Sequence, residues 1–193
     1  MTAFFTRCCK KCRRLIALAA LALSLPAAAP AHAEGIEVRH AALVAGEEGY
    51  FLEADFEIAL NPTLEEALNK GVSLYFLLEL EVIRPRWYWF NEKVVNTQQQ
   101  YRLSYNALTR QYRLGVGGFF QNFSDLSEAL DFLSRVRRRQ VLEPGVLSPG
   151  RIYAAGVRMR LDVSQLPKPF QLNALASRDW NFGSEWYHWS VTP

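Results

Sequence analysis

The sequence predicts a mainly β protein, an antiparallel β-sandwich of immunoglobulin-like type with about eight strands and two helical inserts. Two observations lead to this fold class. Many short segments are either strongly apolar or alternate between apolar and polar side chains. They are joined by connections of hairpin length rather than by regularly alternating helices, which argues against a doubly wound α/β fold.

The first two strands are expected at residues 36–44 and 50–60, with a turn at residues 46–49 between them. Apolar side chains occupy every other position of the second strand, which is typical of a strand with one buried face. Its polar face carries the acidic residues Glu53, Asp55 and Glu57.

A short helix is expected at residues 63–70. Thr63, three residues before Glu66, resembles a capping box, and Gly71 suits the C-terminal end of the helix. Beyond it, strands are expected at residues 72–83, 87–95, 98–105 and 111–117. Pro85 separates the first two of these strands, and a hairpin loop at residues 106–110 joins the last two. The first of these strands is so apolar that it should be central in its sheet.

A second helix is expected after Ser124 or Asp125, because apolar side chains recur at helical spacing as far as Val136. The arginine-rich residues 135–139 would then lie at its C-terminal end, where the helix dipole favours cations. The same run is a candidate for binding an anionic ligand or a lipid headgroup.

The remaining expectations are a loop at residues 143–150, a strand at 151–163, an extended or turn segment at 166–169 and a final strand at 185–191.

Residues 1–33 are interpreted as a cleavable signal peptide and residues 34–193 as a single domain. A segment with five basic residues and no acidic one precedes an apolar run at residues 15–25. A stretch of mostly small residues follows and ends at Ala31-His32-Ala33, whose two alanines fit the −3 and −1 positions of a signal peptidase site. Because the apolar run is too short to span a bilayer as a helix, we expect a periplasmic protein without stable membrane insertion after cleavage. An uncleaved anchor is the alternative.

Composition argues against several classes of function. The three cysteines, Cys8, Cys9 and Cys12, all lie in the signal peptide, so the mature domain is expected to have neither disulfide nor thiol chemistry. The signal peptide also holds five of the 22 basic residues and none of the 19 acidic ones, so the net charge of +3 becomes −2 after cleavage. A nucleic-acid partner is therefore not expected.

Catalytic, metal and nucleotide motifs are absent, and we expect neither a cofactor nor an enzyme. His40 and His188 are far apart in sequence and would form a zinc site only if the fold brought them together. Glu79 and Glu81 share one strand face at a separation of ~6.5–7 Å, within the range of inverting glycosidases. Arginines on other strands can pair with them, which favours an ordinary charged face with cross-strand ion pairs.

The five tryptophans lie in two short segments. We select Trp87, Trp89, Trp186 and Trp189 as candidate residues for binding a ligand or a partner, because exposed aromatic surface marks binding sites. The alternative is that these side chains pack inside the sandwich and beneath its loops.

Several segments resemble a known family. They are the strand at residues 50–60, residues 74–80 followed by Arg86-Trp87-Tyr88-Trp89, the motif Leu166-Pro167-Lys168-Pro169-Phe170, and Trp180-Asn181-Phe182 with Trp186-Tyr187. Together they are similar to a family of exported Gram-negative proteins catalogued as domain of unknown function family 4390. The resemblance implies a periplasmic location and supplies no activity, cofactor or catalytic residue. Genes of this family often neighbour that of a membrane sensor histidine kinase of the nitrogen-regulation type, which suggests an accessory role in signalling.

The leading hypothesis is therefore a non-enzymatic periplasmic protein that binds an envelope protein, with the extracytoplasmic part of a sensor kinase as one candidate. The second is a module for a small molecule or glycan that uses the tryptophans as a platform. The third is an envelope hydrolase that uses Glu79 and Glu81. A protein binder should present an open strand edge or a flat patch, a ligand module a concave aromatic pocket, and a hydrolase both carboxylates in a cleft.

Export gives the first testable prediction. N-terminal sequencing of the protein recovered from the cell envelope should begin at or near Glu34, because signal peptidase cleaves after small residues such as Ala33. Recovery of the envelope protein with Met1 still in place would instead indicate an uncleaved anchor.

Overall fold

The computed structural model describes residues 34–86 and 92–193, which belong to one compact unit. Its strands form two antiparallel sheets, so the predicted fold class is confirmed. The strands are β1 (Gly35–Gly46), β2 (Gly49–Ala59), β3 (Leu74–Arg84), β4 (Glu92–Asn106), β5 (Gln111–Val116), β6 (Phe119–Phe123), β7 (Arg135–Leu142), β8 (Tyr153–Leu161) and β9 (Tyr187–Val191). The helices are α2 (Pro62–Asn69), α3 (Leu126–Ser134) and α4 (Lys168–Ala176), with 3-10 turns η1 (Val163–Gln165) and η2 (Arg178–Trp180).

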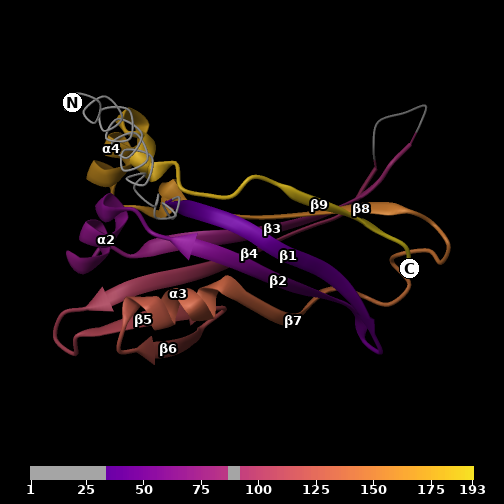
Figure 1. Cartoon of the computed structure of the whole chain (residues 1–193), viewed down its shortest axis with the longest axis horizontal. Helices are drawn as coiled ribbons and strands as arrows, with labels where there is room; N and C mark the ends of the chain where they lie inside the picture. Colours follow the sequence, from indigo (N-terminus) through magenta and orange to yellow (C-terminus); the bar gives the residue numbers. More distant parts are fainter. Residues whose placement is uncertain (1–33, 87–91) are drawn as a thin grey trace, which may run out of the picture. The chain divides into compact units, whose positions relative to one another are not determined.

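The small sheet has the strand order β1-β2-β7, and the large sheet has the order β6-β5-β4-β3-β8-β9. Figure 1 shows β1 and β2 crossing over the strands of the large sheet. Leu52 and Phe56 of β2 belong to the same buried cluster as Leu78 of β3 and Met159 of β8. The inner faces of the two sheets thus form one sandwich core, where each fully buried large apolar side chain contributes about 1.5–3 kcal/mol.

The central position of β3 is confirmed, since it lies between β4 and β8. Its even-numbered side chains, from Leu74 to Val82, are buried in the sandwich. Its odd-numbered side chains, among them Glu79 and Glu81, lie on the opposite face because successive side chains of a strand alternate. This outer face of the large sheet carries the candidate site.

Helix α2 begins one residue earlier than predicted, at Pro62, and its cap is Asn61 rather than Thr63. The Asn61 side chain accepts a hydrogen bond from the Leu64 backbone N–H at 2.9 Å and donates one to the Asp179 carbonyl at 2.7 Å. Proline is favourable at the first helical position because it lacks an N–H that would otherwise be unpaired. The capping prediction was therefore wrong in its residue, although the helix itself is confirmed.

The predicted helix end at Gly71 is confirmed. Gly71 has φ of +89°, a left-handed conformation that favours glycine. Its N–H donates to the Leu68 carbonyl at 2.9 Å, and the Val72 N–H donates to the Ala67 carbonyl at 3.0 Å. These two bonds form a Schellman motif that satisfies the last carbonyls of the helix.

Two strand predictions need correction. Residues 92–106 form the single strand β4, so the predicted division between residues 95 and 98 was wrong; Asn96 and Thr97 continue the pairing with β3. Strand β6 was not predicted. It follows Gly117-Gly118, whose φ angles of +54° and +95° suit a tight hairpin turn.

The arginine run at residues 135–139 does not end a helix. Helix α3 stops at Ser134, and β7 begins at Arg135 and pairs with β2. The interpretation as a capped helix end was therefore wrong, because tertiary strand pairing overrides the helical spacing. The extended segment predicted at residues 166–169 is also partly wrong: α4 begins at Lys168, and Pro169 is tolerated in its first turn.

Candidate functional site

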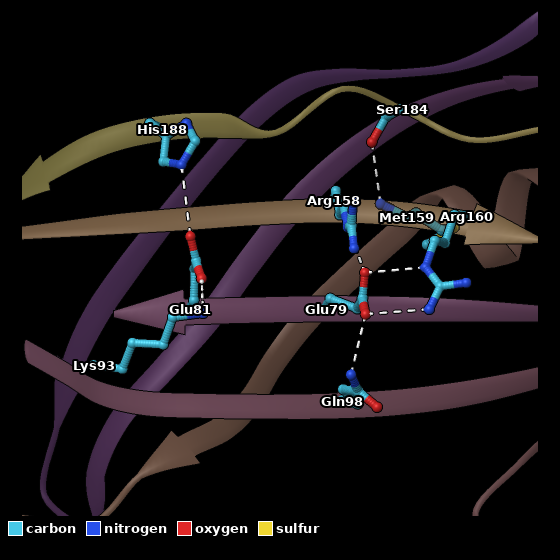
Figure 2. A network of polar contacts seen from close by, with 9 residues as sticks. All are labelled: Glu79, Glu81, Lys93, Gln98, Arg158, Met159, Arg160, Ser184 and His188. Carbon is cyan, nitrogen blue, oxygen red and sulfur yellow. Dashed lines mark hydrogen bonds and ion pairs between the residues drawn. The ribbon is translucent and has the colours of Figure 1, made fainter. Parts of the chain in front are cut away.

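The candidate site lies on the outer face of the large sheet, where β3, β8 and β9 are neighbours. The register pairs Glu79 with Arg158 of β8 and with Gln98 of β4. One step along, Glu81 is paired with Gly156, which in turn is opposite His188 of β9. Figure 2 shows the resulting row of polar side chains across these strands.

The Glu79 carboxylate is the centre of the first polar network. Arg160 donates from Nε to Glu79 Oε2 at 3.2 Å and from Nη2 to Oε1 at 3.4 Å. Arg158 donates from Nε to the same Oε2, and Gln98 donates from Nε2 to Oε1 at 3.0 Å. Both oxygens are therefore engaged by donors from the strands on either side.

Glu79 is only 5% exposed, although it lies on the outer face of the sheet. Burial alone would raise the pKa of its carboxyl group, but the hydrogen bonds and charges of Arg160 and Arg158 outweigh burial and hold the pKa below its ordinary value. A general acid of a glycosidase needs the opposite, a raised pKa. The geometry thus gives Glu79 a role in ion pairing rather than in proton donation.

Glu81 forms the second network. Its Oε2 is 3.3 Å from Lys93 Nζ, and its Oε1 is 3.8 Å from His188 Nε2. His188 lies close to the backbone of Gly156, where a Cβ atom would be only 2.8 Å from the His188 ring. Glycine at position 156 therefore leaves the space in which the ring of His188 rests on the sheet.

The two networks are joined by Trp186. The ring of Trp186 stacks on that of His188 with centroids 6.0 Å apart, and the guanidinium carbon of Arg158 lies 4.5 Å from the centroid of a Trp186 ring. Arg158 therefore contacts both Glu79 and Trp186, and such a cation–π contact contributes about 0.5–1 kcal/mol where it is exposed.

A pocket of about 740 Å³ lies beside this cluster. Arg158, Arg160 and Trp186 line one side of it. Asp162, Glu185 and the segment from Trp180 to Ser184 are also part of its wall. A concave surface with convergent polar groups and an ion pair of shifted pKa is the usual form of a binding site.

The structure places the selected tryptophans differently. Both Trp186 and Trp189 are half-buried: Trp186 lies on the outer face at the pocket, whereas Trp189 packs against the core. Trp87 and Trp89 lie outside the described residues. Trp180, which was not selected, is buried under Phe170 with ring centroids 5.7 Å apart.

The cross-strand ion pairs expected for the acidic residues are present. Besides the partners of Glu79, Arg137 pairs with Asp55, and Arg39 pairs with Glu57.

His40 lies on β1 and His188 on β9, in different sheets. Over residues 34–86 and 92–193, the structure contains no group of three or more side chains that could hold a metal ion. In the same ranges, no helix has the length and apolar character needed to cross a bilayer.

A second surface, which the sequence analysis missed, surrounds edge strand β6. Phe119 is 85% exposed and Phe120 is 55% exposed. A pocket of about 580 Å³ lies at the Phe123 end of this strand, lined by Phe123, Glu128, Asp131, Phe132, Arg135 and Arg137. The glycine pair before β6, followed by three phenylalanines in five residues, was the sequence signal that could have revealed it.

Comparison with known proteins identifies a family and no nearer relative. A family model described as Domain of unknown function (DUF4390) matches residues 33–190, so the chain belongs to that family and the resemblance drawn from its motifs is confirmed. No curated protein and no solved structure matches the chain.

The Glu79 network predicts a pH-dependent loss of stability. Because the folded-state pKa of Glu79 lies below the ordinary value of 4.5, its contribution to stability is fully present above that value and is lost as pH falls through the folded-state pKa. Replacing Glu79→Gln should lower the free energy of unfolding by about 1–3 kcal/mol at pH 7, since both guanidinium groups lose their counter-ion while staying partly solvated. Thermal melts of both proteins between pH 7 and pH 3 test this, and the difference should shrink below pH 4.5.

Glu47→Gln is a suitable control, because Glu47 is exposed in the turn between β1 and β2. It should melt like the wild type across the same range. A Glu79→Gln protein that melts like the wild type at pH 7 would show that the buried ion pairs are not stabilising.

The two described candidate tryptophans should respond differently to truncation. Trp189→Ala should cost about 2–4 kcal/mol because its ring packs against the core, whereas Trp186→Ala should cost about 1 kcal/mol, roughly the value of its contact with Arg158. Denaturant unfolding of both variants measures this, with buried Trp180→Ala as the reference for a core tryptophan. Equal, core-like losses at positions 186 and 189 would assign Trp186 to packing.

Proposed function

We propose that this member of the DUF4390 family is an exported, non-enzymatic binding protein of the bacterial envelope that captures an extended segment of a protein partner along strand β6. The observation that carries the proposal is an uncharged, aromatic sheet edge with a pocket beside it. Main-chain pairing at an open edge supplies affinity in this mode of recognition, and pockets for alternate side chains supply specificity.

The four sheet edges differ in how they are protected against pairing. Edge strand β1 carries Glu37 and Arg39 and a bulge between Val38 and His40, and β7 carries four arginines. Charges and bulges of this kind block association with other strands. Strand β6 has the sequence Phe-Phe-Gln-Asn-Phe, with neither charge nor proline. Of these three edges, it is the one at which pairing meets the least electrostatic resistance.

Strand β9 is also an edge, but it is less available. Trp189 and Val191 of β9 pack into the core, and His188 faces Glu81 on the outer face. Strand β6, by contrast, exposes the rings of Phe119 and Phe120. Large exposed aromatic side chains at an edge are typical of a surface that a partner covers.

The pocket beside β6 gives the added segment a place for a side chain. Phe123 of β6 and Phe132 of α3 line its apolar part, with ring centroids 5.6 Å apart. Glu128, Asp131, Arg135 and Arg137 also line the pocket and carry both signs of charge, and Arg135 Nη2 lies 3.9 Å from Asp131 Oδ2. An extended segment with an apolar side chain directed into this pocket fits the combination of edge and pocket.

The family supplies the candidate partner. The resemblance to this family of exported proteins implies a gene that neighbours that of a membrane sensor kinase, so the extracytoplasmic part of such a kinase is the first protein to test. A non-enzymatic role agrees with the engagement of Glu79 and Glu81 in ion pairs and with the lowered pKa of Glu79.

Crosslinking from the edge tests the proposal. A photo-crosslinking phenylalanine analogue at position 119 in the full chain should form an adduct with one envelope protein in intact cells, because Phe119 is 85% exposed on the pairing edge. The crosslinked segment, identified by mass spectrometry and made as a peptide, should bind the purified protein, and Phe119→Lys should weaken that binding about tenfold or more.

Leu108 provides the matched control, since it is 97% exposed at the turn between β4 and β5 of the same sheet. A crosslinker at position 108 should give no such adduct, and Leu108→Lys should bind the peptide like the wild type. Equal adducts from both positions, or unchanged binding by Phe119→Lys, would contradict strand addition at β6.

A further inference from the structure

We propose that the pocket of about 740 Å³ beside β8 and β9 binds a small molecule that carries one carboxylate group and an apolar group. This inference goes beyond the proposed function, because the pocket lies at the opposite end of the large sheet from β6. Its ligand would be recognised by side chains that the protein partner does not need to touch.

The carboxylate is assigned to the two arginines that line the pocket. Arg158 uses its Nε for Glu79, and Arg160 uses its Nε and Nη2. Within residues 34–86 and 92–193, no hydrogen bond or ion pair occupies Nη1 or Nη2 of Arg158 or Nη1 of Arg160. These N–H groups are the ones that remain for a ligand oxygen, and guanidinium donors match a planar carboxylate well.

Glu79 prepares the arginines for this role. Its carboxylate is buried and fixes one edge of each guanidinium group, so the remaining donors are held in place before a ligand arrives. The side chains of Arg158 and Arg160 are still 31% and 39% exposed. Donors that are oriented in advance lose little conformational entropy on binding.

The other charges of the pocket limit how much negative charge a ligand can carry. Asp162 and Glu185 also line the wall, and Glu79 lies beneath the arginines. Asp162 is partly engaged, since its Oδ1 accepts hydrogen bonds from the Ser164 backbone N–H at 3.2 Å and from the Ser164 hydroxyl at 2.6 Å. A dianion such as a phosphate ester would meet about twice the repulsion from these groups that a monocarboxylate meets, and an amino group on the ligand would offset part of it.

The apolar part of the ligand is assigned to the aromatic wall. Trp186 lines the pocket together with Phe182 and Ala174. Trp186 is itself held by Arg158 and His188, so its ring presents a fixed surface. An apolar group packed against this wall adds contact area without a further cost in side-chain ordering.

Four related probes test the assignment by calorimetry on protein purified from cells that express the full chain. They are 3-phenylpropionate, phenylalanine, phenethylamine and phenyl phosphate. The two carboxylates should bind, and each should bind at least about tenfold more tightly than the amine and the phosphate. Tighter binding of the phosphate or of the amine, or no binding of either carboxylate at millimolar concentration, would overturn the proposal.

Variants assign the binding to this pocket. Arg160→Gln should weaken the binding of 3-phenylpropionate about tenfold or more, while Arg113→Gln, which changes an exposed arginine near Phe120, should leave it unchanged. Because Arg160→Gln also removes a partner of Glu79, a second variant is needed. Ala174→Leu narrows the pocket and leaves the Glu79 ion pairs intact, and it should weaken binding as well. Wild-type binding by Ala174→Leu and Arg160→Gln would place the ligand elsewhere and overturn the proposal.

Discussion

The buried carboxylate of Glu79 constrains the large sheet more than any other single group. It lies on the central strand β3, where water has little access, so its oxygens must be satisfied by the strands on either side. Gln98 of β4 and Arg158 and Arg160 of β8 supply the donors. A slip of β8 by one residue would carry its arginines to the sandwich core, so the carboxylate specifies the register of β3 against β8.

The same requirement shapes the surface that surrounds it. Two arginines pair with one carboxylate, and the N–H donors that they do not use for Glu79 belong to side chains that line the pocket. Arg158 also reaches the ring of Trp186 and so ties the segment before β9 to the centre of the sheet. Glycine at position 156 leaves room for His188 beside it. The binding features of this face are therefore a consequence of how the sheet satisfies a buried charge.

Local patterns were sufficient to predict the elements whose burial follows a simple period. Three features reflect such local preferences, and the structure confirms them. They are the alternation of apolar and polar side chains in β2, the apolar run of β3 and the glycine that ends α2. The predictions failed where pairing at long range decides. The apolar spacing of α3 continues in phase to Val136, yet the chain turns into β7 at Arg135 because β2 offers an unpaired edge there.

The same contrast between local patterns and long-range pairing holds for the candidate site. That Glu79 and Glu81 share a face follows from their spacing. Arginine partners were expected for both; Glu79 has them, whereas Glu81 pairs with Lys93 and lies near His188. The choice of Arg158 and Arg160 depends on the register of β8, and the burial of Glu79 depends on what lies over β3. Neither can be read from one segment of the chain. Trp186 and Trp189 illustrate this, since only two residues separate them and they lie on opposite faces of the sheet.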